Sequence, residues 1–467
     1  MEFNTDLPAL PKGWVWTRVG KIYDIVGGGT PSTKVNEYWI GDIPWITSAD
    51  IIGLKDIRPR KYINKKAIED SATNLVPKSS LIIVTRVGLG KVALTKYSLC
   101  FSQDCQALIG KNFQPHPDYS LYYLSQVVQI FKYQHRGTTI SGVTKKQLSE
   151  LLFALPPLPE QHRIVNKIEE LFTKLDAGVD ALKKIKIQLK RYRQAVLKNA
   201  FEGKLTQQWR EAHKGELEPA SVLLEKIKEQ RKKESKGKFI ELPPIATSEL
   251  PELPEGWVWT RVGVISEINP KFYKENFYDD AEITFLPMRC VEELTGRINL
   301  SITKKLSEVI KGYTYFADGD ILYAKITPCM ENGKIAIAYN LKNGVGFGST
   351  EFHVIRLYKL LPRKFLFFFL IQRSLRKDAQ RQMTGSAGQL RVPVNYLSHV
   401  SVPLPPLPEQ HQIVSEIERR LSVADQLEKV VEQSLKQAER LRQSILKRAF
   451  EGKLVPQDPT DEPAEKL

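Results

Sequence analysis

Side chains that suit contact with a polyanion gather in short loops of this sequence. The stretch TRVGLGK carries Arg86 and Lys91, and the later stretch AKITPCMENGK carries Lys325 and Lys334. Lysine and arginine neutralise phosphates, whereas arginine, glutamine, serine and threonine also form hydrogen bonds with the edges of bases. The chemistry that these loops can supply is therefore the binding of a nucleic acid.

Two further loops, HRGTTISGVTKKQL and RQMTGSAGQLRVPVNYL, contain the same mixture of charged, hydroxyl and amide side chains. A solvated polar loop is the alternative for any one of these residues taken alone. Together with the four cations above, the predicted DNA-binding residues in these loops are Arg136, Thr138, Thr139, Lys145, Lys146, Arg381, Ser386, Gln389 and Arg391.

The net charge points the same way. The chain has 69 Lys and Arg against 53 Asp and Glu, a formal charge of +16. Such a surplus favours a polyanionic partner. A membrane is not expected, because the sequence has neither an amphipathic or lipidated anchor nor an apolar run that could span a bilayer. The four cysteines form no CxxC pair, and residues 1–10 do not resemble a signal peptide, so we expect a cytoplasmic protein.

Signatures of catalysis are not found in the sequence. It contains neither a GxxxxGK[ST] phosphate loop nor an HExxH metal motif. GVGFG (344–348) imitates a nucleotide loop, but the corresponding stretch of the repeat described below has no glycines, which favours a strand. NPKF (269–272) lacks the second proline of an adenine methyltransferase motif and is predicted to be a turn. The chain is therefore predicted to be no enzyme by itself, with no catalytic residue, metal site or cofactor of its own.

The chain contains a long internal duplication. LPKGWVWTRVG (10–20) returns as LPEGWVWTRVG (253–263), and the octapeptide LPPLPEQH is written at 155–162 and 404–411. AFEGKL also occurs twice, at the same distance from each octapeptide, which indicates a segment of fixed length. The 467 residues thus read as two copies of a globular unit followed by a long helix.

The octapeptide predicts the start of that helix. Pro159 and Pro408 suit the first helical position, because proline has no N–H group to leave unpaired there. Glu160 and Glu409 place negative charge at the positive end of the helix dipole. The glycine of each AFEGKL suits a left-handed C-terminal cap. Each helix would run for roughly 65 Å at ~1.5 Å per residue.

Apolar residues within each predicted helix recur in steps of four and three, which is the heptad spacing of a coiled coil. The stripe runs from Ile164 to Val196 in the first copy and from Ile413 to Ile445 in the second. A helix that packs only on its own globular unit is the alternative, but the apolar stripe is long for such a helix. The predicted fold class is α+β, with two mixed α/β globular units, two long coiled-coil helices and an internal pseudo-twofold repeat.

These segments also carry a family resemblance. LPKGWVWTRVG, GDIPWITSADI, FGSTEFHVIRL and the repeated LPPLPEQH and AFEGKL resemble the specificity subunit of type I restriction–modification systems over essentially the whole chain. The resemblance implies two target recognition domains, each reading one half of a split double-stranded DNA site, and two helices that pair antiparallel as a spacer. It also implies two adenine methyltransferase (modification) subunits that use S-adenosylmethionine, and restriction subunits, as partners. A duplicated DNA-binding scaffold or regulator that works without a methyltransferase is the alternative.

The repeat and the resemblance together predict six segments along the chain. They are target recognition domain 1 (1–154), spacer helix 1 (155–205), a charged linker with a short helix around 219–234 (206–252), target recognition domain 2 (253–403), spacer helix 2 (404–454) and a C-terminal tail (455–467). The tail QDPTDEPAEKL begins to echo GELEPASVLLEKI, so the duplication looks circular.

Antiparallel pairing over the full length of both helices predicts which residues face each other. Leu171 would face Ala438 and Ile185 would face Ala424, so that large side chains meet small ones. A shift by one heptad would shorten the overlap and lose this matching of sizes.

Overall fold

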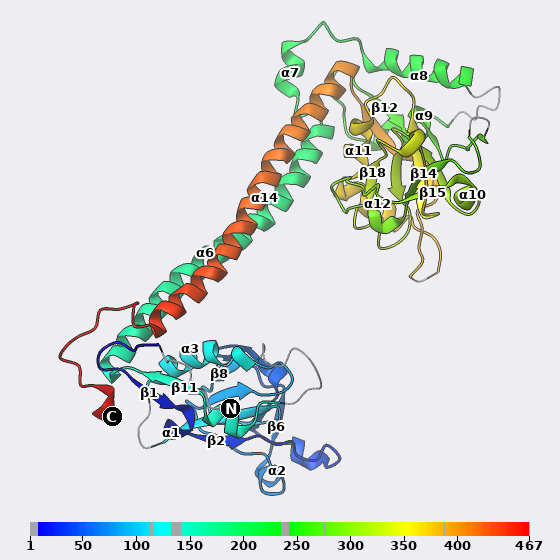
Figure 1. Cartoon of the computed structure of the whole chain (residues 1–467). Coiled ribbons are helices and arrows are strands. Elements are labelled where there is room, and N and C mark those ends of the chain that lie inside the picture. Colours follow the sequence, from blue (N-terminus) through cyan, green and yellow to red (C-terminus); the bar gives the residue numbers. More distant parts are fainter. Residues whose placement is uncertain are drawn as a thin grey trace. The chain divides into compact units, whose positions relative to one another are not determined.

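The chain divides into two compact units. Residues 1–183 and 432–467 form the first unit, and residues 184–431 form the second. Each unit contains one globular domain and a part of both long helices, α6 (Leu158–Phe201) and α14 (Leu407–Phe450) (Figure 1). The computed structural model describes residues 8–111, 115–131, 142–234, 242–274, 277–386 and 388–466.

The globular domain of the first unit is built on two sheets. The main sheet has the strand order β2-β10-β7-β8, and a smaller sheet has the order β6-β3-β9. The strands are β1 (Val15–Arg18), β2 (Tyr23–Gly27), β3 (Ile43–Ile46), β4 (Ile51–Gly53), β5 (Asp56–Ile57), β6 (Lys61–Ile63), β7 (Leu81–Val84), β8 (Val92–Leu94), β9 (Cys100–Phe101), β10 (Cys105–Gly110) and β11 (Leu152–Leu155). The helices are α1 (Val19–Ile22), α2 (Lys65–Glu69), α3 (Pro117–Val127) and α5 (Lys145–Ser149), with single 3-10 turns η1 (Asn36–Trp39) and η2 (Ser48–Asp50).

The second unit repeats this plan. Its main sheet has the order β13-β20-β17-β18, which matches the first domain strand for strand, and its smaller sheet has the order β15-β14-β19-β16. The strands are β12 (Val258–Arg261), β13 (Ser266–Ile268), β14 (Glu282–Leu286), β15 (Thr303–Lys305), β16 (Thr314–Ala317), β17 (Ile321–Ala324), β18 (Ile335–Ile337), β19 (Val345–Gly348), β20 (Phe352–Leu357) and β21 (Ser401–Leu404). The helices are α7 (Gln207–Ala212), α8 (Ala220–Glu234), α9 (Val262–Ile265), α10 (Leu306–Val309), α11 (Arg363–Leu370), α12 (Arg373–Arg381) and α13 (Val394–His399), with the 3-10 turn η5 (Met288–Cys290).

Strand β7 explains why a run of apolar residues forms a strand here. Leu81 and Ile83 pack into one core, and Ile82 and Val84 pack into another on the opposite face of the sheet. Because successive side chains of a strand alternate between faces, a strand buried on both faces reads as a continuous apolar run. Strands β7 and β8 form one hairpin and β17 and β18 form another, and VGFG (345–348) forms β19, a buried strand, as predicted.

The long helices begin and end close to the predicted residues. Each starts one residue before the predicted proline, at Leu158 and Leu407. The two capping glycines have the predicted left-handed backbone, with φ of +70° at Gly203 and +67° at Gly452. The predicted short helix in the linker is α8.

The two repeated motifs form one joint in each unit. The Trp14 indole Nε1 donates to Glu160 Oε2 at 2.9 Å, and the Trp257 indole donates to Glu409 Oε2 at 2.8 Å. Both carboxylates are buried, with exposed fractions of 1% and 0%. The motif GWVW and the octapeptide are therefore written twice because they bind each other in each copy, in addition to starting the helix.

A second contact at each joint shows the circular character of the repeat. In the second unit the backbone N–H of Ala220 donates to Gly256 O, and in the first unit Ala464 N–H donates to Gly13 O, both at 2.9 Å. Ala220 and Ala464 are the alanines of the two EPA stretches, and both are buried. Asp461 also pairs with Arg163 at 2.5 Å, which holds the tail on α6.

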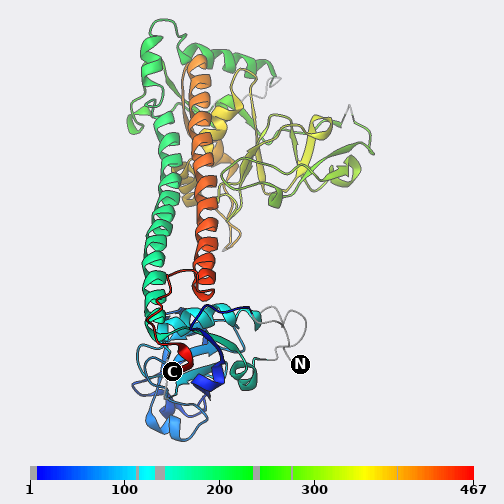
Figure 2. The same ribbon diagram turned by 60° about the vertical axis from the view of Figure 1, so that its left-hand side comes forward.

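Within each unit the segments of α6 and α14 run side by side in opposite directions (Figures 1 and 2). In the first unit Asp176 pairs with Arg442, whose guanidinium lies 4.2 Å from the ring centroid of Phe172. In the second unit Arg193 pairs with Asp425, and with Glu428 at 2.9 Å. The antiparallel arrangement implied by the resemblance is confirmed in both units.

The predicted register is wrong by one heptad. Leu171 does not face Ala438, because it lines a groove of the first unit together with Leu175, Leu441 and Ile445. The physical reason lies at the start of each helix. There Ile164 packs into a core that the first domain shares with Ile445 of α14, and Ile413 packs into a core that the second domain shares with Val196 of α6. The start of each helix therefore packs against its own domain and the end of the other helix together.

Candidate nucleic-acid interface

The structure brings the two polar loops of the second domain together at the end of its main sheet. The backbone N–H of Lys325, just after β17, donates to Glu351 O at 2.9 Å. Val392 N–H then donates to Lys325 O at 2.9 Å, and Thr327 N–H donates to Leu390 O at 3.0 Å. The β17–β18 loop and the loop before α13 therefore form one surface.

The first domain makes the same connection. Thr85 N–H, just after β7, donates to Asp104 O, and Val143 N–H donates to Thr85 O, both at 2.8 Å. Gln106 Nε2 also donates to Val143 O at 3.4 Å. The two backbone bonds of Thr85 correspond to the two of Lys325, so each domain presents a loop pair at the same end of its sheet.

A histidine takes the place of the glutamine in the second domain. His353 Nε2 donates to Val392 O at 2.8 Å, while its Nδ1 accepts from the Asn269 amide at 3.3 Å. Burial lowers the pKa of His353 below its ordinary value, which favours the neutral ring that these two bonds require. A charged imidazole is therefore not the chemistry offered at this position.

Two predicted lysines already have partners within the protein. Lys91 Nζ donates to Ser48 O and Ile51 O, both at 3.0 Å, and Lys334 Nζ donates to Met288 O at 3.3 Å. An ammonium group has three donors, so a phosphate contact by either lysine stays a prediction.

Arg391 is also held within the domain. Its Nε and Nη2 donate to the two carboxylate oxygens of Glu351 at 2.9 and 2.8 Å, and its Nη1 donates to Gln389 O at 3.0 Å. The hydrogen bonds from Arg391 lower the pKa of Glu351. This bidentate pair braces the loop against the strand β20, and a contact of Arg391 with DNA stays a prediction.

The remaining predicted residues fall into three groups. Arg86 is exposed, and the backbone of Gly142 passes it so closely that a Cβ at that glycine would lie 2.6 Å from Arg86 Cγ. Lys325 is half-buried at the loop junction. Exposed residues in or beside the loops are Lys145, Lys146, Arg381, Ser386 and Gln389, whereas Arg136, Thr138 and Thr139 lie outside the described residues.

The prediction from sequence missed a basic stretch of the first domain, RPRKYINKK (58–66). Lys61 Nζ lies 4.9 Å from the ring centroid of Trp39, and Arg60 pairs with the buried carboxylate of Asp50 at 2.5 Å. The run of cations was visible in the sequence, but only the structure places it on β6 and α2, beside the turn η2 that Lys91 contacts.

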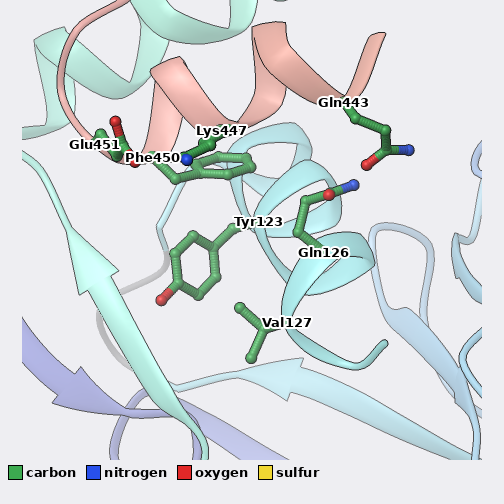
Figure 3. Close-up of a pocket in the computed structure, with 7 residues that line it drawn as sticks. All are labelled: Tyr123, Gln126, Val127, Gln443, Lys447, Phe450 and Glu451. Atoms are coloured by element: carbon green, nitrogen blue, oxygen red, sulfur yellow. Dashed lines mark ion pairs between the residues drawn. The ribbon is translucent and has the colours of Figure 1, made fainter. Parts of the chain in front are cut away.

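A groove of the first unit lies between α3 and the end of α14 (Figure 3). Its volume is about 490 Å³, and it is lined by Tyr123, Gln126, Val127, Gln443, Lys447, Phe450 and Glu451. The rings of Tyr123 and Phe450 lie 5.1 Å apart between centroids, so the groove is a seam of packing between helix and domain. Across the described ranges of the chain, no group of three or more His, Cys, Asp or Glu side chains is placed to hold a metal ion.

Comparison with known proteins places these observations in a family. A family model described as the type I restriction modification DNA specificity domain matches residues 11–191 and again residues 254–437. The two matches correspond to the two copies of the internal repeat. Among the helices that the structure describes, none has both the length and the hydropathy needed to cross a bilayer.

Curated relatives carry related names. The chain is 38% identical over 346 residues to the type I restriction enzyme EcoAI specificity subunit of Escherichia coli, covering 64% of this chain and 57% of that protein. It is 37% identical over 326 residues to the EcoEI specificity subunit, covering 60% of this chain and 54% of that protein. The chain thus spans little more than half the length of these two relatives. The EcoDI specificity subunit is 27% identical over 450 residues and is covered to 90%.

Two solved structures share the fold. One, described as the structural basis of complex assembly and conformational transition of the type I R-M system, matches with a TM-score of 0.60 and 19% identity, covering 95% of this chain and 99% of that chain. The other is the HsdS subunit from Thermoanaerobacter tengcongensis, with a TM-score of 0.53, 20% identity, and coverage of 96% and 99%. At these identities the likeness concerns the fold alone.

Proposed function

Because the chain belongs to the family of type I restriction–modification DNA specificity domains, we propose that it is a sequence-specific DNA-recognition subunit. Each globular domain would read one half of a bipartite double-stranded site. The observation that carries the proposal is the repeated loop pair, held by corresponding backbone bonds at Thr85 and Lys325. The supports are the same in both domains, while the loops between them differ in length and side chains, as two readers of different sequences require.

The proposed partners are those that the resemblance to the family implies. Methyl transfer to adenine would be performed by two modification subunits, which would bind S-adenosylmethionine, and cleavage would be performed by restriction subunits. The chain itself would be non-catalytic and would work in the cytoplasm, where the DNA is. It would hold the modification subunits and select the DNA sequence on which they act.

Methylation mapping tests the proposal. Host DNA is sequenced for methylated adenine with and without this chain and the proposed modification subunit. A two-part methylated sequence should be found only when both proteins are present. The purified chain alone should transfer no methyl group from S-adenosylmethionine to DNA. Methylation by the chain alone would contradict a non-catalytic subunit.

A duplicated DNA-binding scaffold that works without a methyltransferase is the alternative function. The same experiment separates the two, because the alternative leaves host methylation unchanged while the chain still binds a bipartite DNA sequence.

A further inference from the structure

Lys91 and Lys334 occupy the same position in the two domains. Val84 N–H donates to Lys91 O at 2.9 Å, and Ala324 N–H donates to Lys334 O at 3.1 Å. Val84 and Ala324 end the first strands of the two hairpins, and each donates to the lysine that follows the hairpin loop. The two lysines are therefore equivalent positions, although the two loops differ in length. This correspondence is not visible from the spacing of the residues.

Both ammonium groups bind to the same feature of the fold. Lys91 Nζ donates to the carbonyls of Ser48 and Ile51, at either end of η2, and Lys334 Nζ donates to the carbonyl of Met288, in η5. The turns η2 and η5 follow the corresponding strands β3 and β14, each of which pairs in parallel with the next strand of the small sheet. In each domain one lysine thus ties the hairpin loop to the small sheet.

The turn that receives Lys91 is itself rigidly held. Thr47 N–H and Oγ1 donate to Asp50 Oδ2 at 2.7 and 2.8 Å, and Arg60 Nε donates to Asp50 Oδ1 at 2.5 Å. Burial alone would raise the pKa of Asp50, but these bonds hold it below its ordinary value, so the carboxylate stays charged. The carbonyls that face Lys91 are therefore fixed acceptors.

The second domain adds further ties to its longer loop. Leu294 N–H donates to Gly333 O at 3.0 Å, and Asn332 Nδ2 donates to Glu293 Oε1 at 2.8 Å. A longer loop has more conformations to lose, so it needs more bonds to be held in one of them.

We infer that Lys91 and Lys334 are positioning residues, which hold the reading loops in shape instead of contacting DNA phosphates; the role rests on the proposed function. A hydrogen bond from an ammonium group to an ordered carbonyl contributes more than one between neutral groups. Lys91 already commits two of the three donors of its ammonium group to the turn, which fixes the position of the group and leaves one donor over. A shared support should also recur in both domains, whereas a residue that reads sequence should differ between them, and these two lysines recur.

The test uses the full-length chain with Lys91→Met, Lys334→Met and, as a charge-matched control, Lys96→Met, which changes an exposed lysine of the first domain. Each protein is used to select from a library of random duplex DNA, and affinity for the selected and for unrelated duplexes is measured at several salt concentrations. Hydrogen exchange of residues 85–92 and 325–334 reports the order of the two loops.

The expected result is specific to one half of the site. Lys91→Met should lower the sequence preference at one half-site by about tenfold, within the range for loss of one base contact. It should leave the other half-site and the salt slope unchanged and speed exchange in residues 85–92. Lys334→Met should do the same at the opposite half-site, and Lys96→Met should do neither. Because the unaffected half-site is read by the same protein molecule, it reports whether the variant is folded.

Two results would overturn the inference. A salt slope reduced by about 1, with equal loss of affinity on every sequence, would make the lysine a phosphate contact. Unchanged preference with unchanged loop exchange would show that the lysine holds nothing. Absence of any two-part preference in the wild-type chain would instead refute the proposed function, while the exchange of residues 85–92 would still decide whether Lys91 orders its loop.

Discussion

Glu160 and Glu409 occupy the same place in the two joints, yet their surroundings predict unequal responses to the same substitution. Glu409 Oε1 accepts from Thr206 Oγ1 and from Arg210 Nη1, both at 2.7 Å. Glu160 Oε1 is buried and has no hydrogen-bond partner among the described residues. Replacing each glutamate by glutamine therefore removes a paired charge in one unit and an incompletely paired charge in the other.

The magnitudes follow from the partners that remain. Glu409→Gln leaves the guanidinium of Arg210, which is 17% exposed, without its carboxylate. Removing one partner of a buried ion pair costs ~3–5 kcal/mol, and we expect about 3, because Arg210 Nη2 keeps its bond to Gly203 O. Glu160→Gln keeps an acceptor for Trp14 and removes a charge that burial disfavours, so its effect should stay within about 1 kcal/mol.

The effect of Glu160→Gln should also depend on pH. Burial raises the pKa of Glu160, so binding of a proton favours the folded unit. The stability that Glu160 contributes is fully present below the ordinary glutamate pKa of about 4.3 and is lost as pH rises through the higher folded-state pKa. Glutamine suffers no such loss. The stability of Glu160→Gln relative to wild type should therefore rise from about pH 4 to pH 7.

Hydrogen exchange of the full-length chain measures both joints at once. Protection of residues 10–20 and 158–165 reports the first joint, and protection of residues 253–263 and 407–414 reports the second. Glu409→Gln should lower protection at the second joint only. Equal losses at both joints in the two variants, or a larger loss from Glu160→Gln, would refute the reasoning from the paired and unpaired oxygens.

Three further predictions follow from the charge and the packing. Affinity for DNA should fall more than threefold between about 50 and 200 mM salt, because basic contacts release counterions, and a smaller fall would contradict phosphate binding. Arg86→Ala should weaken recognition of one half-site and Lys325→Ala that of the other, each by ~1–3 kcal/mol if bases are contacted, and equal weakening of both half-sites would exclude base reading. Ala424→Leu, at a fully buried position of α14, should lower the free energy of unfolding by ~1–3 kcal/mol through overpacking, whereas a solvent-facing Ala424 would tolerate it.

The elements of the fold could be predicted because their signals are local. Left-handed glycines end both long helices, and VGFG (345–348) forms a strand, as the sequence indicated. The register between α6 and α14 could not be predicted, because it depends on which surface each apolar residue packs against. Ile164 fits a heptad stripe equally well whether it packs on α14 alone or in a core shared with its own domain, and it lies in such a shared core with Ile445 of α14.

The types of residue in the candidate site could be predicted from the sequence, but their hydrogen-bond and ion-pair partners could not. The sequence identified the cations of the loops, whereas the carbonyls that bind Lys91 belong to residues some 40 positions earlier in the chain. A carbonyl acceptor leaves no signature in the type of its residue. For the same reason the ion pair of Glu351 with Arg391 could not be foreseen, although both residues were visible as charges.

Some parts of the repeat are the same in both copies, and other parts differ between them. The joint residues are constant because Trp14 and Trp257 each bury an indole N–H that needs an acceptor, and the glutamate at the start of the helix supplies it in both copies. Most loop residues are free to differ because, beside the shared lysines Lys91 and Lys334, the bonds common to both loop pairs run through the backbone at Thr85 and Lys325, and any residue except proline can donate such a bond. A support made of backbone bonds lets one fold carry two different sets of reading side chains. This explains how a nearly identical frame can surround two loop pairs with little sequence in common.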